Sequence, residues 1–383
     1  MKKVVLLNIL FVVMLFAVVS PGWAQNEQYS YQKLLRKAII ERPLDRTGVY
    51  QFLSPSTGWD PPGPRFAIII GLREYNAVPF LINVLQNGPD WSDDELPKFY
   101  KPKADMLRYV ARCYAALCLG SIRDSRALDP LLTVLNDTSI ETYKYGDKLT
   151  RRGEYNLRAH AAFALGYLGD RRAVKPLIKS LKQDGFEECI YALARLEAVT
   201  AVPIIVQVAS DRNLFSGDIN RCLEYILKVN FTLQTAKEDR RYQFIEQFPE
   251  IGTIHFKDIY RKLWQHWMKA GDRYAKEQFE EYYPQWKAAL KDKPNAPSRH
   301  RALQKKMLKG GVAATPYLIA EIENGDNALI PVASKLTKPR NRRIKDISAN
   351  LSENATLTKA LEWWKKNKQK WVVFQPTPPT PKK

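Results

Sequence analysis

The sequence is poor in the features that mark disulfide scaffolds, fibrous proteins and membrane proteins. It has four cysteines in 383 residues, too few for a disulfide-built fold. Its 18 glycines and 24 prolines exclude a collagen-like or low-complexity chain. No apolar run after Val19 approaches the roughly 20 residues of a transmembrane helix, so we expect no membrane span in the mature chain. A hydrophobic content of 45% and a charged content of 26% instead indicate a soluble, packed protein.

The signatures of common enzymes are also missing. The chain contains no nucleophile elbow, P-loop or dinucleotide-binding motif. Its four histidines form no zinc-binding pair, and His160, placed among alanines, is expected to be packed or partly exposed. We therefore predict no catalytic residue, no metal, no cofactor and no enzyme activity. The alternative is an enzyme without a known motif, whose activity would depend on one buried carboxylate or histidine.

Residues 1–24 have the pattern of a secretory signal peptide. Lys2 and Lys3 precede an apolar run from Val4 to Val19, and the segment ends in small residues suited to cleavage near Ala24. At about 16 residues this run is shorter than a membrane span, which makes a retained anchor the lesser alternative. The mature protein is therefore predicted to be periplasmic or secreted.

The rest of the chain repeats itself. Residues 119–132 match residues 165–178 without a gap, and residues 192–206 match residues 164–178 at their apolar positions. Shorter copies begin at Ala77 and Ala314. Each unit predicts a helix rich in alanine and leucine, a tight turn, and a second helix that opens with proline or valine. In the turns, Asp124 and Asp170 are expected to cap helices. Since one hairpin cannot bury its own apolar faces, the copies must stack.

This pattern, L-G-x-[LI]-x-D-x-R-A-[VL]-x-P-L-[LI], resembles the short HEAT-like repeat of the type named after phycobilisome lyases, in the armadillo-like superhelix class. The resemblance covers residues 65–211 well and 299–337 moderately. It implies an all-α fold, an α-solenoid of helical hairpins. It says little about function, because the family includes cofactor-attachment proteins as well as many binding scaffolds.

Tryptophan-containing basic helices suggest two arrays, each closed by such a helix. We expect a signal peptide over 1–24, an N-terminal array over 25–290, a short C-terminal array over 299–374 and a proline-rich tail over 375–383. In the last helix, Trp364 and Trp371 are expected to share a buried face with Leu361. Trp363 points elsewhere and is the better surface candidate.

Two insertions, 88–105 and 138–155, interrupt the repeats and should emerge from one edge of the array. They carry aromatic and basic side chains of the kinds found at protein-binding hot spots. The candidate partner-binding residues are Trp91, Phe99, Tyr100, Tyr143, Tyr145, Arg151 and Arg152. The alternative is that these are ordinary ordered loops whose aromatic side chains pack against the helical array.

Basic residues outnumber acidic ones by 60 to 40, a net charge of +20. The excess concentrates in 335–345 and 365–370, which predicts an anionic partner. An exported protein is unlikely to meet nucleic acid, so an acidic protein, anionic lipid or acidic glycan is expected instead; a solvated face without a partner is the alternative. The candidate anion-binding residues are Arg340, Arg342, Arg343, Lys345, Lys365 and Lys366.

All four cysteines fall in first-helix patterns, where a small buried hydrophobe is expected. A Cys189–Cys222 bridge is left open, although stacked helices usually lie too far apart for one.

The leading hypothesis is an exported HEAT-repeat scaffold that binds a protein partner in the cell envelope through its concave face and the aromatic insertions. The alternative is a basic module that docks on an anionic membrane or envelope polysaccharide. The salt dependence of binding distinguishes the two hypotheses. Binding through surface charge weakens at moderate ionic strength, whereas binding through the aromatic insertions should persist.

Overall fold

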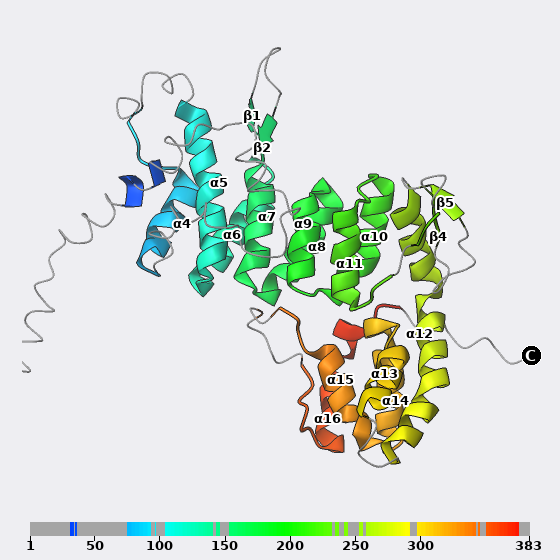
Figure 1. Ribbon diagram of the computed structural model, residues 1–383. Helices are drawn as coiled ribbons and strands as arrows, with labels where there is room; N and C mark the ends of the chain where they lie inside the picture. Colours follow the sequence, from blue (N-terminus) through cyan, green and yellow to red (C-terminus); the bar gives the residue numbers. More distant parts are fainter. Residues whose placement is uncertain are drawn as a thin grey trace, which may run out of the picture. The chain divides into compact units, whose positions relative to one another are not determined.

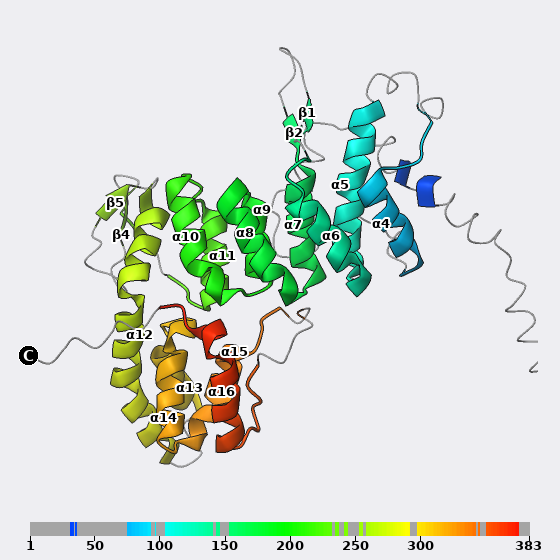
Figure 2. The same cartoon turned by 180° about the vertical axis from the view of Figure 1, so that it is seen from behind.

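The computed structural model describes most of the repeat region and the C-terminal helices. The described residues are 31–33, 35–36, 75–92, 96, 104–140, 143–145, 153–231, 234–236, 241–243, 253–255, 258–291, 297–341, 344 and 350–374. The chain divides into two compact units, Met1–Leu168 and Gly169–Lys383. Each unit is built from helical hairpins that pack on their neighbours (Figures 1 and 2), which confirms the predicted α-solenoid.

The described residues of the first unit form four longer helices. They are α4 (Val78–Asn87), α5 (Ala104–Ile122), α6 (Leu128–Asn136) and α7 (Leu157–Leu168), with 3₁₀ turns at Tyr75–Ala77 and Ser125–Ala127. Helix α4 packs on α5 and α6, and α7 packs on α5 and α6. Every residue of α7 is buried, which explains why its sequence is almost entirely small and apolar.

Glycine and alanine let α5 and α7 approach each other closely. A Cβ atom added at Gly120 would lie 2.6 Å from the carbonyl oxygen of Ala164 and 2.7 Å from its Cα atom. Real side chains do not tolerate such distances to backbone, so glycine is required there. The alanine-rich repeat pattern therefore encodes the spacing between neighbouring first helices.

Arginine side chains bind the C-terminal ends of preceding second helices. Nε of Arg112 in α5 donates to the carbonyl oxygen of Leu85 in α4 at 2.8 Å. Nε of Arg158 in α7 donates in the same way to Leu135 of α6 at 3.0 Å. The last carbonyls of a helix have no partner within the helix. These guanidinium groups act as the missing hydrogen-bond donors and fix successive hairpins to each other.

The turns inside the hairpins are capped as expected. The side chain of Asp124 accepts a hydrogen bond from the backbone N–H of Arg126, and that of Asp170 accepts one from Arg172. Each carboxylate also binds the guanidinium group of the same arginine. Aspartate is therefore fixed at this position by the geometry of the turn.

The second unit begins with four repeat helices and continues into a long helix. Its elements are η7 (Arg171–Ala173), α8 (Val174–Asp184), α9 (Glu187–Arg195), η8 (Val199–Ala201), α10 (Val202–Asp211), α11 (Gly217–Leu227), α12 (Ile259–Lys291), α13 (Pro297–Met307), η11 (Gly311–Ala314), α14 (Thr315–Glu323), η12 (Asn327–Leu329), α15 (Ile330–Thr337) and α16 (Leu357–Trp371). Helices α8, α10 and α12 pack in that order, while α9 packs on α8 and α11.

Short strands occur in both units, although none was predicted. Strands β1 (Tyr143–Tyr145) and β2 (Gly153–Tyr155) form an antiparallel hairpin in which Tyr143 faces Tyr155. In the second unit, β3 (Gln234–Ala236), β4 (Arg241–Gln243) and β5 (Thr253–His255) form an antiparallel sheet in that order. All five strands lie in insertions between helices, so the helical repeat itself remains all-α.

The compact units divide at Leu168 and Gly169, whereas the sequence suggested two arrays that meet near residues 291–298. The reason lies in α12, which runs as one helix of 33 residues and packs on both α10 and α13. The ring of Trp286 in α12 stacks on that of His300 in α13, with centroids 5.1 Å apart. This packing places both sides of the predicted joint in the second unit.

The buried face of α16 differs from the predicted one. Its buried residues are Ala360, Trp363, Asn367 and Trp371, whereas Trp364 is only partly buried. The prediction that Trp363 is the surface residue was wrong. Both sets have helical spacing, and the packing of α16 on α14 and α15 selects the set that contains Trp363.

A buried ion pair joins the repeat helices of the second unit to its C-terminal helices. Glu197 and Lys228 follow the first helices of successive hairpins, and both have left-handed backbone conformations, with φ of 48° and 57°. Nζ of Lys228 lies 3.7 Å from a carboxylate oxygen of Glu197, with both side chains almost fully buried. The ammonium also donates to the carbonyl oxygens of Leu336, in the last turn of α15, and of Lys338, just after it.

The other Glu197 oxygen completes this junction. It accepts a hydrogen bond from the backbone N–H of Asn341 at 2.7 Å, and the Asn341 side chain donates to the carbonyl oxygen of Arg195 at 2.8 Å. Burial lowers the pKa of Lys228 to about 8 against the opposing effect of Glu197, so the lysine remains charged near neutral pH.

Replacement of Gly120 by alanine should destabilise the protein by about 1–3 kcal/mol, because the new methyl group collides with the α7 backbone. Chemical denaturation followed by circular dichroism measures the change. Gly217→Ala is the matched control, since its Cβ meets nothing closer than 3.8 Å. Equal effects from the two substitutions would contradict the close approach at Gly120.

Replacement of Lys228 by methionine should cost about 3–5 kcal/mol, because it leaves the carboxylate of Glu197 buried without its counter-charge. Adding Glu197→Gly should recover most of the loss, since glycine removes the charge and accepts the left-handed backbone. The exposed Asp218–Arg221 pair is the control, and Arg221→Ala should cost at most about 1 kcal/mol. A mild effect of Lys228→Met, with no recovery in the double variant, would show that the pair is dispensable.

Candidate functional site

Two C-terminal helices of the second unit form the candidate site. Helix α14 starts with proline in its first turn and ends at Glu323. Helix α16 starts at a Thr356 cap, whose hydroxyl accepts a hydrogen bond from the backbone N–H of Lys359. The buried Trp363 and Trp371 hold α16 in place, and this orientation turns Trp364 toward a hollow on the surface.

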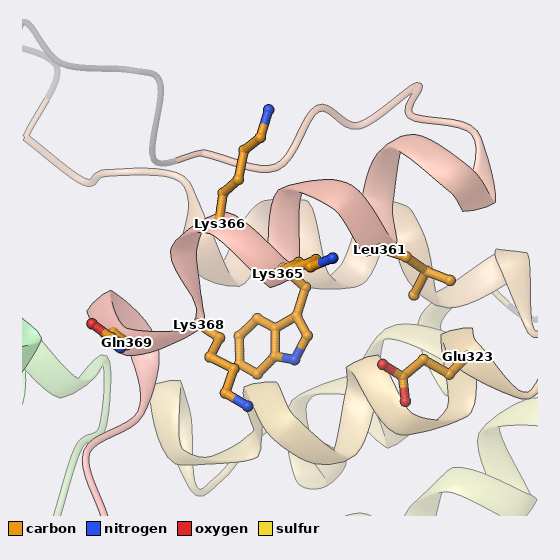
Figure 3. Close-up of a pocket in the computed structure, with 7 residues that line it drawn as sticks. Glu323, Leu361, Lys365, Lys366, Lys368 and Gln369 are labelled. Carbon is orange, nitrogen blue, oxygen red and sulfur yellow. The ribbon is translucent and has the colours of Figure 1, made fainter.

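The hollow is a groove with a cavity volume of about 620 Å³. One residue of α14 and six of α16 line it (Figure 3): Glu323, Leu361, Trp364, Lys365, Lys366, Lys368 and Gln369. Leu361 and Trp364 are partly buried, whereas the charged and amide side chains are exposed. The groove therefore has an apolar floor and a polar rim.

Positive charge dominates the rim. The lining residues include three lysines and one carboxylate, that of Glu323. Lys366 points to the opposite side of α16 from Lys368, which points toward the helix that carries Glu323 (Figure 3). A tryptophan ring beside ammonium groups can hold an apolar anchor while the lysines attract carboxylates. We call this set the α16 groove.

The structure places only part of the predicted anion-binding set in the groove. Lys365 and Lys366 line it. Arg340 is exposed and lies over the ring of Tyr225 in α11, with its guanidinium carbon 5.7 Å from the ring centroid. Arg342, Arg343 and Lys345 lie outside the described residues.

The predicted aromatic partner-binding set is described only in part. The ring of Trp91 is 5% exposed, so this residue is buried and not displayed as expected. The carbonyl oxygen of Trp91 accepts a hydrogen bond from Arg108 of α5, which draws the start of the insertion onto the helices. Tyr143 and Tyr145 belong to β1, but their side chains lie outside the described residues, as do Phe99, Tyr100, Arg151 and Arg152 entirely.

The four cysteines and His160 are buried in the helical core. Cys113, Cys118, Cys189 and Cys222 form no disulfide and are buried, as their first-helix positions predicted. Burial lowers the pKa of His160, and its Nδ1 lies 2.6 Å from the carbonyl oxygen of Asn156. The described residues contain no cluster of three or more potential metal ligands. None of the helices described is both long and apolar enough to cross a membrane.

A family model described as PBS lyase HEAT-like repeat matches residues 111–137 and 157–183. The chain contains HEAT-like repeats. The first match runs from α5 through η6 to α6, and the second covers α7, η7 and most of α8. No curated protein and no solved structure matches the chain significantly.

The α16 groove lies outside both HEAT-like matches, and most of it was missed from sequence. Trp364 was assigned to the core, and Leu361, Lys368, Gln369 and Glu323 were not identified as site residues. The run W-W-K-K-N-K-Q-K at 363–370 was the available signal, because four lysines follow directly after two tryptophans. Helical periodicity alone does not determine which of two adjacent tryptophans is buried.

The stability of the protein should fall as the pH rises above 9, because two buried thiols resist ionisation only in the folded state. Burial raises the pKa of Cys222 to about 12 and that of Cys113 well above its ordinary value. Since both pKa values are raised on folding, their contribution is complete below the unfolded pKa of about 9 and is lost as the pH rises toward the folded values.

Denaturation under reducing conditions between about pH 8.5 and 10 measures this effect before tyrosine ionisation dominates. The double variant Cys113→Ala/Cys222→Ala should be less stable at every pH but show a shallower decline. An unchanged slope would mean that the two thiols are not buried as described.

Proposed function

We propose that this HEAT-like repeat scaffold binds an acidic protein segment with an apolar anchor residue through the α16 groove. The observation that carries the proposal is the combination of the partly buried Trp364 and Leu361 with the lysines around them. An apolar side chain of the partner would rest on the floor, and carboxylates on either side of it would face Lys365 and Lys368. In this reading the protein acts by binding, not by catalysis.

Export to the cell envelope is part of the same proposal. It is supported by the basic start, the apolar run and the small residues of 1–24. The partner would then be a protein of the periplasm or of the cell exterior.

A second candidate surface is the insertion over 138–155. One observation favours it: β1 and β2 pair as a hairpin directly before α7, and β2 packs on α5. An ordered hairpin base on a helical scaffold is a common way to present binding side chains. Tyr143 and Tyr145 would be the aromatic contacts of this surface.

Binding of a defined peptide tests the groove. The probe is a fluorescent peptide with one phenylalanine between runs of aspartate and glutamate, and fluorescence anisotropy measures its affinity. Trp364→Ala should weaken binding by about tenfold or more, because it removes a partly desolvated aromatic contact. Lys365→Gln/Lys368→Gln should weaken it as well.

Lys359→Gln/Lys370→Gln is the matched control, since it removes the same charge from exposed positions of α16 that do not line the groove. It should bind the peptide nearly as well as the parent protein. If both lysine pairs weakened binding equally and Trp364→Ala had no effect, charge alone would hold the peptide. That result would favour the basic surface-binding module over the groove.

A further inference from the structure

The second-helix layer of the second unit carries a surface that the groove does not use. On α8, Lys175, Lys179 and Lys182 are all exposed, and their spacing of four and three residues places them on one face. This row extends over roughly 10 Å of the helix. From Val174 to Gln183 the helix contains no acidic residue.

A second row lies on α12. Lys262 and Lys269 are exposed and share a face with Gln265. Nε2 of Gln265 donates to the hydroxyl of Ser210 at 3.3 Å, which places this face beside the C-terminal end of α10. The first third of α12, from Ile259 to Lys269, also lacks acidic residues.

Helix α10 separates the two rows and is almost uncharged on its exposed side. Its exposed residues are Gln207 and Asp211, and Arg212 follows directly. The guanidinium group of Arg212 donates to the carbonyl oxygens of Asp184 and Gln183, which fixes the end of α8 beside the end of α10. The contacts of Arg212 and Gln265 thus join α8, α10 and α12 at the same end of α10.

The layer of first helices has the opposite character. Helix α9 begins with Glu187 and Glu188, and α11 carries Asp218 in its first turn. Among helices α8 to α12, the exposed lysines therefore lie on the second-helix layer and not on the first helices. We call the five lysines of α8 and α12 the lysine face.

We propose that the lysine face docks the protein on the surface of an anionic phospholipid bilayer. The separation of the two rows favours a planar anionic ligand over a linear polyanion. Neighbouring packed helices lie about 8–10 Å apart, so rows on α8 and α12 are separated by roughly twice that distance. A single extended chain that follows one row misses the other, whereas a flat charged surface meets both.

Lysine suits this role because its ammonium is a compact, hydrated charge on a flexible stem that adapts to headgroups without fixed geometry. Each lysine near an anionic bilayer contributes additively to binding, and the attraction falls off within a Debye length. The docking is therefore reversible and sensitive to salt. It is independent of the α16 groove, which uses an aromatic floor on other helices.

Vesicle cosedimentation tests the proposal. The probe is a vesicle of phosphatidylcholine and phosphatidylglycerol, with pure phosphatidylcholine as the uncharged surface. Lys175→Gln/Lys179→Gln/Lys182→Gln should weaken binding to the anionic vesicle by about a hundredfold. Lys262→Gln/Lys269→Gln should weaken it by about thirtyfold. Both rows are exposed, so thermal unfolding should be nearly unchanged.

Lys365→Gln/Lys366→Gln/Lys368→Gln is the matched control, because it removes three charges from the α16 groove. This variant should retain vesicle binding but lose binding of the acidic peptide. The lipid proposal and the proposed peptide-binding function can therefore fail independently. Equal loss of vesicle binding in both triple variants would overturn the lysine face in favour of total charge. A loss confined to the α8 row would overturn the planar ligand. Equal binding to uncharged vesicles would exclude charge as the cause.

Discussion

The ion pair between Glu197 and Lys228 is the interaction on which the second unit depends. It connects the ends of two first helices, and through Leu336, Lys338 and Asn341 it ties them to the end of α15 and the segment that follows it. Helix α16 packs on α15, on α14 and on η8. The orientation of Trp364 therefore depends on a charge pair that lies in the interior of the unit, away from the groove. Removal of one partner leaves a buried charge, which is far more costly than loss of a surface pair.

The backbone at these positions shows why the pair is unusual. A left-handed residue closes the first helix of each hairpin: Arg123, Gly169, Glu197 and Lys228. Glycine accepts this conformation without strain, whereas other residues pay roughly 1–2 kcal/mol. Three of these four positions nevertheless carry charged residues, and Glu197 and Lys228 belong to consecutive hairpins. From this position the side chains of Glu197 and Lys228 meet between neighbouring hairpins.

The sequence predicts the repeat and its local chemistry, but not the contacts between distant segments. Asp124 and Asp170 could be predicted as caps because the turn needs an acceptor at one fixed place. The buried cysteines followed from first-helix periodicity. Trp363 and Trp91 were misplaced, since their burial is decided by α14, α15 and Arg108 and not by their own helix or loop. The junction of Glu197 and Lys228 has no local signal, because its backbone partners Leu336 and Asn341 lie more than 100 residues further along the chain.

The architecture also explains why both candidate surfaces consist of side chains that contribute little to folding. The core of each hairpin is alanine, leucine and glycine at close spacing, and the helix ends are satisfied by Asp124, Asp170, Arg112 and Arg158. Exposed positions on α8, α12 and α16 are then free to vary in charge, since their substitution leaves no cavity and no unpaired buried group. Lysine has accumulated at these positions on two separate sets of helices. A scaffold of this kind acquires binding properties through its outer residues, while the repeat pattern that specifies the fold stays the same.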